Sequence, residues 1–198
     1  MIDDDGVRRL WLLEPTGPAV VLGSTQREAT VDGDACRQLG VEVVRRRSGG
    51  GAVWVAPDDP VWIDIVVPRG DPLWDDDVQR SFLPIGRAWQ YALTSVGVFG
   101  TTVHEGGMLR TPWSDAVCFA GTGPGEVLRD GAKLVGISQR RTRAGARFQC
   151  ALPRRWSIEP LRSLLRPAPP VGVLDGCGAG VGDVPSAALV AGPASALG

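Results

Sequence analysis

Short apolar runs separated by turn residues occupy the beginning of the chain. Residues 10–13 and 19–22 are two such runs, and a stretch containing proline and glycine lies between them at residues 15–18. Brief runs of leucine, tryptophan and valine bounded by turn residues are typical of strands. The pattern predicts two short strands that form a hairpin or lie side by side.

A second group of apolar runs surrounds a loop of glycines. Residues 31–39 predict a short helix that ends at Gly40, and residues 41–44 predict a buried strand. After the glycines, residues 52–55 and 61–67 are rich in valine, isoleucine and tryptophan, and a turn of aspartates and prolines separates them. This spacing predicts a strand, a glycine loop and then a β-hairpin.

The clearest helical pattern covers residues 75–96. It starts with acidic residues, which are favoured in a first helical turn, and it stops before Gly97. Apolar side chains recur with helical spacing at Val78, Phe82, Ile85, Trp89 and Leu93. We therefore predict one long amphipathic helix with a buried face.

Three further apolar runs lie in the second half of the chain, at residues 126–128, 133–139 and 147–152. Short turns that each contain a glycine separate them, which predicts a three-stranded meander. Residues 156–165 predict a closing helix. Together these elements predict an α+β fold with a mixed, mostly antiparallel sheet flanked by helices.

The composition changes near the end of the chain. A length of 198 residues with 43% hydrophobic residues predicts one domain with a substantial core. From Arg166 onward the sequence is rich in proline, glycine and alanine and carries almost no charge. We assign residues 1–166 to the domain and predict that residues 167–198 form a poorly ordered tail.

The overall charge is close to neutral, with a formal value of −1 and a pI near 5.8. Such a surface does not favour nucleic acid or an anionic membrane as a partner. The four cysteines lack the spacing of zinc ligands, and no apolar run is long enough to span a bilayer. We expect a cytoplasmic protein with reduced cysteines and without a structural metal.

Two basic, glycine-containing segments carry the candidate chemistry. Residues 45–53 read RRRSGGGAV, and residues 131–141 read GAKLVGISQRR. Consecutive glycines let backbone N–H groups approach a ligand closely, and arginines add permanent positive charge. Lys133 is the only lysine of the chain and lies in an apolar run, where an ammonium is costly unless it meets an anion. The two segments predict a site for a negatively charged, activated ligand.

These segments resemble the signatures of a known family. Residues 45–53 are similar to the RRxSGGGAV signature of lipoate-protein ligases and related octanoyltransferases, and residues 131–141 are similar to their GxKxxGxxQRR segment. The resemblance runs from about residue 10 to about residue 165. It implies that residues 1–166 form a biotin/lipoate ligase catalytic domain, with an acyl tunnel between the glycine loop and the lysine strand.

The resemblance also implies residue roles. Lys133 would be catalytic and contact the substrate carboxylate and the α-phosphate, while Arg46 and the glycine amides would stabilise the departing phosphate charge. It implies no metal ligand among the residues. The substrate- and nucleotide-binding positions are Arg45, Arg46, Ser48, Gly49, Gly50, Gly51, Ala52, Gly136, Gln139 and Arg140.

For the activity, the resemblance first implies a ligase. Such enzymes use ATP to convert lipoate into its adenylate, which a lysine of a lipoyl carrier domain then attacks. We therefore expect lipoate or octanoate as substrate, a lipoyl carrier domain as partner, and ATP with Mg²⁺ as cofactors.

A second possibility rests on Cys118. The Cys118-Phe119 pair resembles a Cys-Phe pair that precedes the lysine strand in octanoyltransferases working through a thioester. Transfer from an octanoyl-acyl carrier protein needs no ATP, but it needs a thiolate nucleophile, which the Lys133 ammonium would favour. A small buried cysteine with only a packing role is an equally open interpretation.

The chain also departs from the family. Val55-Ala56 follow Trp54 where ligases carry His-Asp, and Phe148-Gln149-Cys150-Ala151 stand where many relatives carry His-Gly-Ser or His-Gly-Thr. Asp64 lies in a strand where asparagine is common and is expected to replace part of its hydrogen bonding. A diverged protein that binds an acyl group or a nucleotide without turnover is therefore a third hypothesis.

Overall fold

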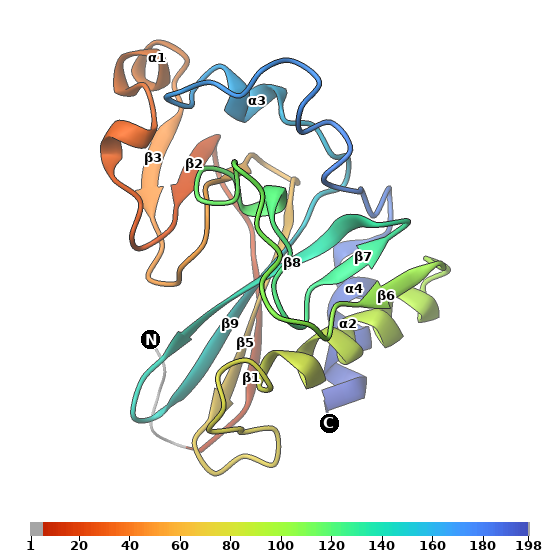
Figure 1. Ribbon diagram of the computed structural model, residues 1–198. Helices are drawn as coiled ribbons and strands as arrows, with labels where there is room; N and C mark the ends of the chain where they lie inside the picture. The colour runs from red at the N-terminus through yellow and green to blue at the C-terminus, as the bar shows by residue number, and fades with distance from the viewer. Residues whose placement is uncertain (1–5, 198) are drawn as a thin grey trace.

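The computed structural model describes residues 6–197, which form two β-sheets surrounded by helices (Figure 1). The larger sheet has the strand order β1-β5-β9-β8-β7-β6 and is antiparallel throughout. The predicted α+β class with a mostly antiparallel sheet is confirmed. Its strands are β1 (Arg9–Leu13), β5 (Val61–Pro68), β9 (Gly145–Leu152), β8 (Ala132–Arg141), β7 (Val127–Arg129) and β6 (Thr101–Val103).

The smaller sheet holds the glycine loop. Its strands are β3 (Glu42–Arg45), β2 (Ala19–Leu22) and β4 (Val53–Val55), in the order β3-β2-β4. β2 is parallel to β3 and antiparallel to β4, so β3 and β4 are the two edges of this sheet. The loop that joins them must therefore cross the end of β2, which brings it beside Gly23.

Helices cover one face of the larger sheet and the outer side of the smaller one. α2 (Phe82–Ser95) buries Ile85, Ala88 and Trp89 against the sheet and packs against α4 (Ser186–Leu197). Figure 1 places α1 (Gly33–Gln38) and α3 (Glu159–Arg162) beside the smaller sheet. No helix within residues 6–197 is both long enough and apolar enough to cross a membrane.

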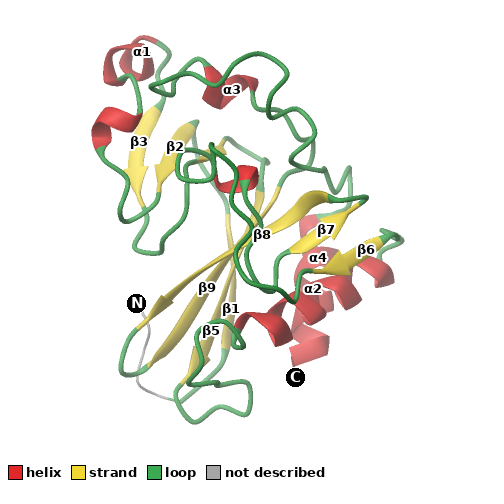
Figure 2. Cartoon of the chain, in the orientation of Figure 1, coloured by secondary structure: helices red, strands yellow, loops and turns green. Residues whose placement is uncertain are grey.

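A long, mostly irregular segment connects β6 to β7, as Figure 2 shows. It contains the short 3-10 helix η2 (Cys118–Ala120), which lies between the smaller sheet and β8. A second 3-10 helix, η1 (Glu28–Thr30), precedes α1. The position of η2 places Cys118 close to both glycine-containing segments.

Strand pairing agrees with the sequence where the partners are neighbours in the chain. The predicted meander is confirmed, because β7 pairs with β8 and β8 pairs with β9. The other two expected hairpins are wrong: β1 pairs with β5, and β4 pairs with β2. β3 is a strand as predicted, but it is exposed because it is an edge.

The helices are shorter than predicted. Residues 75–81 form turns, in which the Asp77 carboxylate accepts hydrogen bonds from the amides of Gln79 and Arg80, and α2 begins only at Phe82. Aspartate side chains compete for backbone amides in this way and favour turns over helix. Of residues 156–165, only α3 is helical, and Pro160 lies in its first turn.

The C-terminal segment does not behave as the predicted loose tail. Residues 177–179 run beside β8, where the Lys133 amide donates to the Cys177 carbonyl and the Ala179 amide donates to the Lys133 carbonyl. Val181 and Leu189 are buried in the main core. The small residues of this segment allow close packing, since Gly192 lies directly against Ala92 of α2.

Candidate active site

The glycine loop is held against the segment that carries Cys118. The Ala52 amide donates to the Ala116 carbonyl at 2.8 Å, and the Cys118 amide donates to the Ala52 carbonyl at 3.0 Å. A Cβ atom on Gly51 would lie 2.5 Å from the Val117 carbonyl carbon, and Gly50 adopts a φ of +95°. Both positions therefore require glycine, one for space and one for conformation.

Three amides of this loop remain available to a ligand. Across the described residues 6–197, the N–H groups of Gly49, Gly50 and Gly51 donate to no other protein group. All three glycines line the same cavity. The loop thus presents unpaired backbone donors, which are suited to an anion or an oxyanion.

Arg46 stabilises the glycine loop through hydrogen bonds to its carbonyls. Its guanidinium donates to the carbonyls of Val21, Gly49 and Gly51 at 2.7–3.1 Å, and the residue is 6% exposed. Burial lowers the pKa of Arg46, while the charge interaction with Cys118 acts in the opposite direction. The family resemblance predicted that Arg46 donates to the ligand, whereas in the structure these donors bind loop carbonyls.

Lys133 lies in the cavity wall and has an internal anion as its partner. Its Nζ lies 2.7 Å from Glu126 Oε2 and donates to the Cys118 carbonyl at 2.7 Å, and it lies 5.6 Å from the Phe119 ring centre. Glu126 also accepts from the amides of Gly123 and Ile137. Both charged residues are buried, so each neutralises the other.

Glu126 is a residue of the site that the sequence patterns did not single out. It lies just before β7, which pairs with the lysine strand β8. The predicted meander indicated that Glu126 lies near Lys133, because a carboxylate before one strand of a hairpin can reach a lysine on the next. A buried lysine therefore implied a nearby carboxylate as well as an anionic ligand.

A cavity of about 260 Å³ joins these groups. The glycine loop forms one side, and Cys118, Glu126, Lys133 and Gln139 contribute to the others. A second hollow of about 610 Å³ shares Gly50, Met108 and Ser114 with it. The two hollows therefore adjoin each other at these residues.

Cys118 differs from the other cysteines in its surroundings. It is half-buried and lines the cavity, with its Sγ 4.0 Å from the position of a Cβ on Gly50. Cys36 and Cys150 are buried, which raises the pKa of both thiols. Burial also raises the pKa of Cys177 to about 11, against the opposing effect of Lys133. Within residues 6–197, Cys118 is the cysteine placed to meet a ligand in this cavity.

Ser48 and Gln149 fasten the loop to the larger sheet. Ser48 Oγ lies 2.9 Å from Ser138 Oγ and donates to Gln149 Oε1 at 2.7 Å. Ser48 is buried and has two partners in the protein. Its position supports a role in holding the loop, and Gln149 supplies the polar partner in β9.

The remaining predicted positions fall into two groups. Gly136 lies beside Phe119 and Lys133 without lining the cavity, and Gln139 lines the cavity while donating to Ser81 Oγ. Arg45 and Arg140 do not line this cavity but a separate groove. The structure therefore brings together the glycines, Cys118, Lys133 and Gln139, and it places those two arginines elsewhere.

Asp64 has a structural partner in this fold. It is buried, accepts from Trp62 Nε1 at 2.9 Å and forms an ion pair with Arg147. Burial raises the pKa of Asp64, although Arg147 acts in the opposite direction. Its hydrogen bonds serve β5 and β9 and not the cavity.

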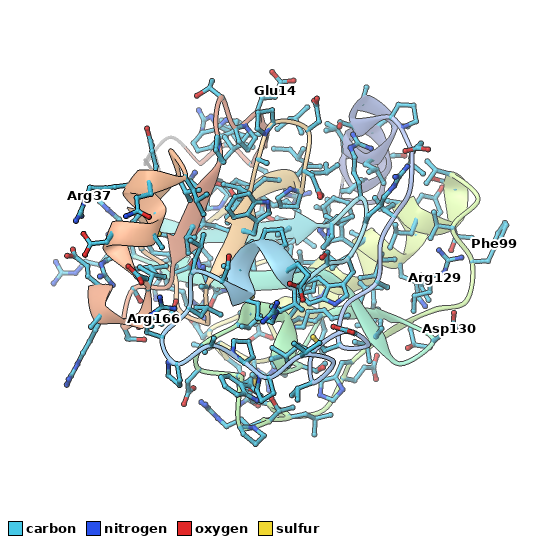
Figure 3. All side chains as sticks on the ribbon, turned by 90° about the horizontal axis from the view of Figure 1, so that it is seen from above. Glu14, Arg37, Phe99, Arg129, Asp130 and Arg166 are labelled. Carbon is cyan, nitrogen blue, oxygen red and sulfur yellow. The ribbon has the colours of Figure 1, made fainter. Side chains whose placement is uncertain are left out.

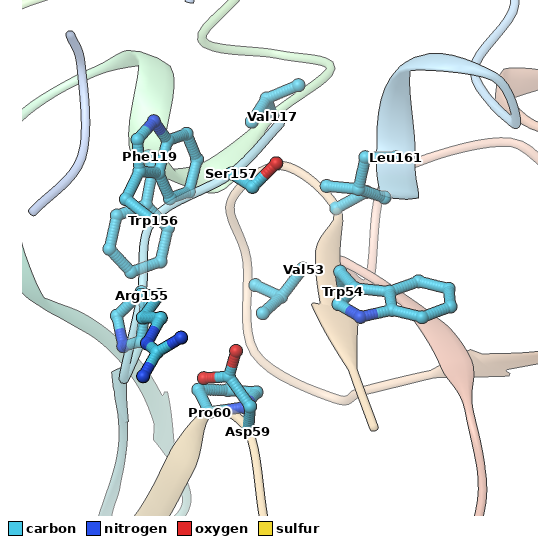
Figure 4. A pocket seen from close by; sticks show the side chains of 12 residues that line it. Val53, Trp54, Asp59, Pro60, Val117, Phe119, Arg155, Trp156, Ser157 and Leu161 are labelled. Carbon is cyan, nitrogen blue, oxygen red and sulfur yellow. The ribbon is translucent and has the colours of Figure 1, made fainter. Parts of the chain in front are cut away.

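A small pocket lies behind Phe119, between β4 and α3 (Figure 4). The rings of Phe119 and Trp156 stack with their centres 4.9 Å apart, and Trp156 donates to the Leu174 carbonyl. The remaining volume is about 30 Å³, which is space for one or two water molecules. Phe119 thus separates this nearly filled pocket from Lys133.

Comparison with known families identifies the relationship. The model of the lipoyl protein ligase A/B catalytic domain matches residues 2–177. The chain belongs to this family. The match covers both glycine-containing segments and the Cys118 region.

Curated relatives agree with this assignment. The chain is 32% identical over 127 residues to octanoyltransferase LipM of Moorella thermoacetica, covering 63% of this chain and 45% of the relative. It is also 32% identical over 141 residues to octanoyltransferase LipM of Carboxydothermus hydrogenoformans, covering 71% and 51%. The chain thus spans about half the length of the curated relatives it matches.

Solved structures share the fold. The protein Ta0514 of T. acidophilum, solved with bound lipoic acid, superimposes with a TM-score of 0.73 at 19% identity, covering 96% of this chain and 72% of that chain. A lipoate-protein ligase A bound with ATP gives 0.73 at 20% identity with the same coverage. At these identities the likeness concerns the fold.

Proposed function

We propose that this protein is an ATP-independent acyltransferase that moves an octanoyl group from a thioester donor, through Cys118, to a lysine of a lipoyl domain. The observation that carries the proposal is the shared cavity, in which a half-buried thiol faces the glycine loop and Lys133. The names of the curated relatives, octanoyltransferase LipM, support the same chemistry.

The first half-reaction transfers the acyl group to the cysteine. The Cys118 thiolate attacks the thioester carbonyl, the carbon–sulfur bond of the donor breaks, and the donor sulfur takes the proton that Cys118 released. The guanidinium of Arg46 lies behind the same loop and attracts a thiolate. The product is an octanoyl thioester on Cys118.

Lys133 and the glycine loop supply the electrostatics of this step. An ammonium has three N–H donors, and two of those of Lys133 are directed to Glu126 and to the Cys118 carbonyl. The contact with Glu126 holds the Lys133 side chain in place. The hydrogen bond to the Cys118 carbonyl holds the backbone of the nucleophile in place. The unpaired amides of residues 49–51 are donors for the oxyanion that forms when the carbonyl is attacked.

The second half-reaction releases the enzyme. The amine of the acceptor lysine attacks the Cys118 thioester, an amide bond forms, and Cys118 leaves as a thiolate that recovers a proton from the amine. The same oxyanion donors serve both steps, because both pass through a tetrahedral intermediate at the same carbonyl.

A ligase reaction is the second candidate, and the unpaired amides of residues 49–51 favour it, since such donors also suit a phosphate. In that reaction ATP, with Mg²⁺, would activate lipoate or octanoate as an adenylate. The glycine loop would hold the phosphate and Lys133 would position the carboxylate. This candidate requires ATP and does not require the thiol of Cys118.

A matched pair of cysteine variants separates these candidates. We expect Cys118→Ser to lower octanoyl transfer from octanoyl-acyl carrier protein to a lipoyl domain at least about a thousandfold, because the nucleophile is lost. Cys177→Ser is the control, since Cys177 is also half-buried and close to Lys133. Mass spectrometry of the lipoyl domain is the measurement.

The reaction is run with and without ATP, and with lipoate or octanoate as free acids. Transfer from the thioester without ATP, with an octanoyl group trapped on Cys118 when the acceptor is omitted, supports the transferase. Transfer that needs ATP and persists in Cys118→Ser would establish the ligase instead. Acyl or nucleotide binding without any product would leave the third hypothesis, a binding protein.

A further inference from the structure

A wide groove lined by arginines lies outside the cavity. It has a volume of about 760 Å³ and lies between the end of β3 and the β8–β9 hairpin, which are on the same side of the molecule in Figure 1. Thr142, Ala144 and Gln149 complete its lining. The arginines are Arg45, Arg46, Arg47, Arg140, Arg143 and Arg147.

The positive charge of this groove is hardly neutralised within the described chain. Of the six arginines, Arg147 is paired with Asp64. The other five form no ion pair among residues 6–197, and Arg45 and Arg46 donate only to neutral carbonyls. No aspartate or glutamate from this part of the chain lines the groove. Five like charges at one site repel one another, so an anionic partner is strongly favoured.

The groove and the cavity share one structural link. Arg46 lines the groove and binds the carbonyls of Gly49 and Gly51, whose loop lines the cavity. Gln149, which lines the groove, also accepts a hydrogen bond from Ser48 of the same loop. A ligand in the groove therefore lies behind the same loop that faces Cys118.

We propose that this groove docks the acyl donor, an acidic carrier protein whose acyl group is carried on an arm attached through a phosphodiester. This inference rests on the proposed transferase function and names its donor site. The phosphodiester and the acidic face around it complement the positive charge of the groove, and the guanidinium groups of Arg47, Arg140 and Arg143, which form no ion pair among residues 6–197, bind phosphate and carboxylate oxygens with paired N–H donors.

The acceptor is a poorer match for the groove. Its reacting group is a lysine amine, which is cationic before the reaction and is repelled by a row of arginines. The second hollow beside the cavity carries less positive charge, because Arg110 is paired there with Asp115 and Arg27 is the remaining charged residue of its lining. The two partners would then approach the cavity from different sides.

A charge reversal tests the donor site. Arg47 and Arg143 are exposed and bind nothing else among residues 6–197, so Arg47→Glu with Arg143→Glu changes the groove and leaves the cavity intact. We expect KM for octanoyl-acyl carrier protein to rise about tenfold or more with kcat little changed. With octanoyl-pantetheine, which has neither protein nor phosphate, we expect no change.

The control is a double reversal with the same change in net charge, Arg37→Glu with Arg87→Glu. Arg37 projects from α1 at the periphery of the molecule in Figure 3, and Arg87 is an exposed residue of α2. Their exposed ion pairs contribute little to stability. We expect this variant to retain the KM of the unchanged protein.

Binding is measured separately from turnover, by fluorescence anisotropy of labelled acyl carrier protein with and without its phosphopantetheine arm. We expect the affinity for acyl carrier protein to fall as the salt concentration rises. We also expect the Arg47→Glu, Arg143→Glu variant to lose this affinity. An unchanged affinity, an equal loss with octanoyl-pantetheine, or an effect confined to KM for the lipoyl domain would overturn the assignment. If acyl carrier protein bound in a groove-dependent way but no acyl group were transferred, the donor site would stand and the proposed transferase function would be wrong.

Discussion

At the scale of single residues, the site depends on one buried ion pair. Lys133 and Glu126 are both buried, with Lys133 Nζ 2.7 Å from Glu126 Oε2, and each makes further hydrogen bonds. Such a pair is costly to desolvate, so its net contribution to stability is small, but loss of one partner leaves an unpaired charge in the core. The pair therefore fixes the geometry around Cys118 more than it stabilises the fold.

The buried pair of Lys133 and Glu126 predicts how stability changes in a double-mutant cycle. Glu126→Gln should lower the free energy of unfolding by about 3–5 kcal/mol, because the Lys133 ammonium remains buried without a counter-charge. Combining it with Lys133→Met should restore most of the stability, since the unpaired charge is gone, but should not restore acyl transfer. Urea unfolding and the transfer assay give the two readouts.

The opposite pattern would contradict this account. If Glu126→Gln cost no stability, or if the double variant were less stable than either single one, the two residues would not act as a pair in the folded protein.

At the scale of elements, the glycine loop is determined by its contact with the Cys118 segment. Two backbone hydrogen bonds join Ala52 to this segment, and they need the close approach that Gly51 permits. The consecutive glycines explain why the loop can bend. The contact with residues 116–118 explains why Gly51 cannot be replaced.

Alanine substitutions in this loop should therefore differ sharply. Gly51→Ala should cost about 1–3 kcal/mol and abolish most acyl transfer, because its Cβ would overlap the Val117 and Cys118 backbone. Gly49→Ala should change stability by less than about 0.5 kcal/mol, because no atom lies within 4 Å of its Cβ position. Thermal unfolding and the transfer assay compare the two, and equal losses would argue against the close contact between Gly51 and the Cys118 segment.

At the scale of the whole molecule, the C-terminal segment completes the core. α4 packs against α2, and Leu189 is fully buried in the same cluster as Trp89. Residues 177–179 extend the hydrogen bonding beside Lys133. The composition of this segment predicted disorder because it has few charges and many glycines, yet small apolar residues are also what close packing between two helices requires.

A buried leucine in this segment gives a direct test. Leu189→Ala should lower the free energy of unfolding by about 2–5 kcal/mol, as for other buried leucines. Val173→Ala should cost less than about 0.5 kcal/mol, because Val173 is 52% exposed. If Leu189→Ala were as harmless as Val173→Ala, residues 167–198 would be the loosely attached tail that the composition predicts.

The sequence by itself determined the features that depend on neighbours in the chain. Local patterns predict the meander of β7, β8 and β9 and the glycine loop, because turns and strand periodicity act over a few residues. They also single out Lys133 as a functional residue, because it is a charged side chain in an apolar run. The tertiary structure decided the rest. The pairing of β1 with β5, the contact of the glycine loop with the Cys118 segment, and the groove that joins Arg47 to Arg143 bring together distant segments, and local patterns carry no information about which distant segments meet.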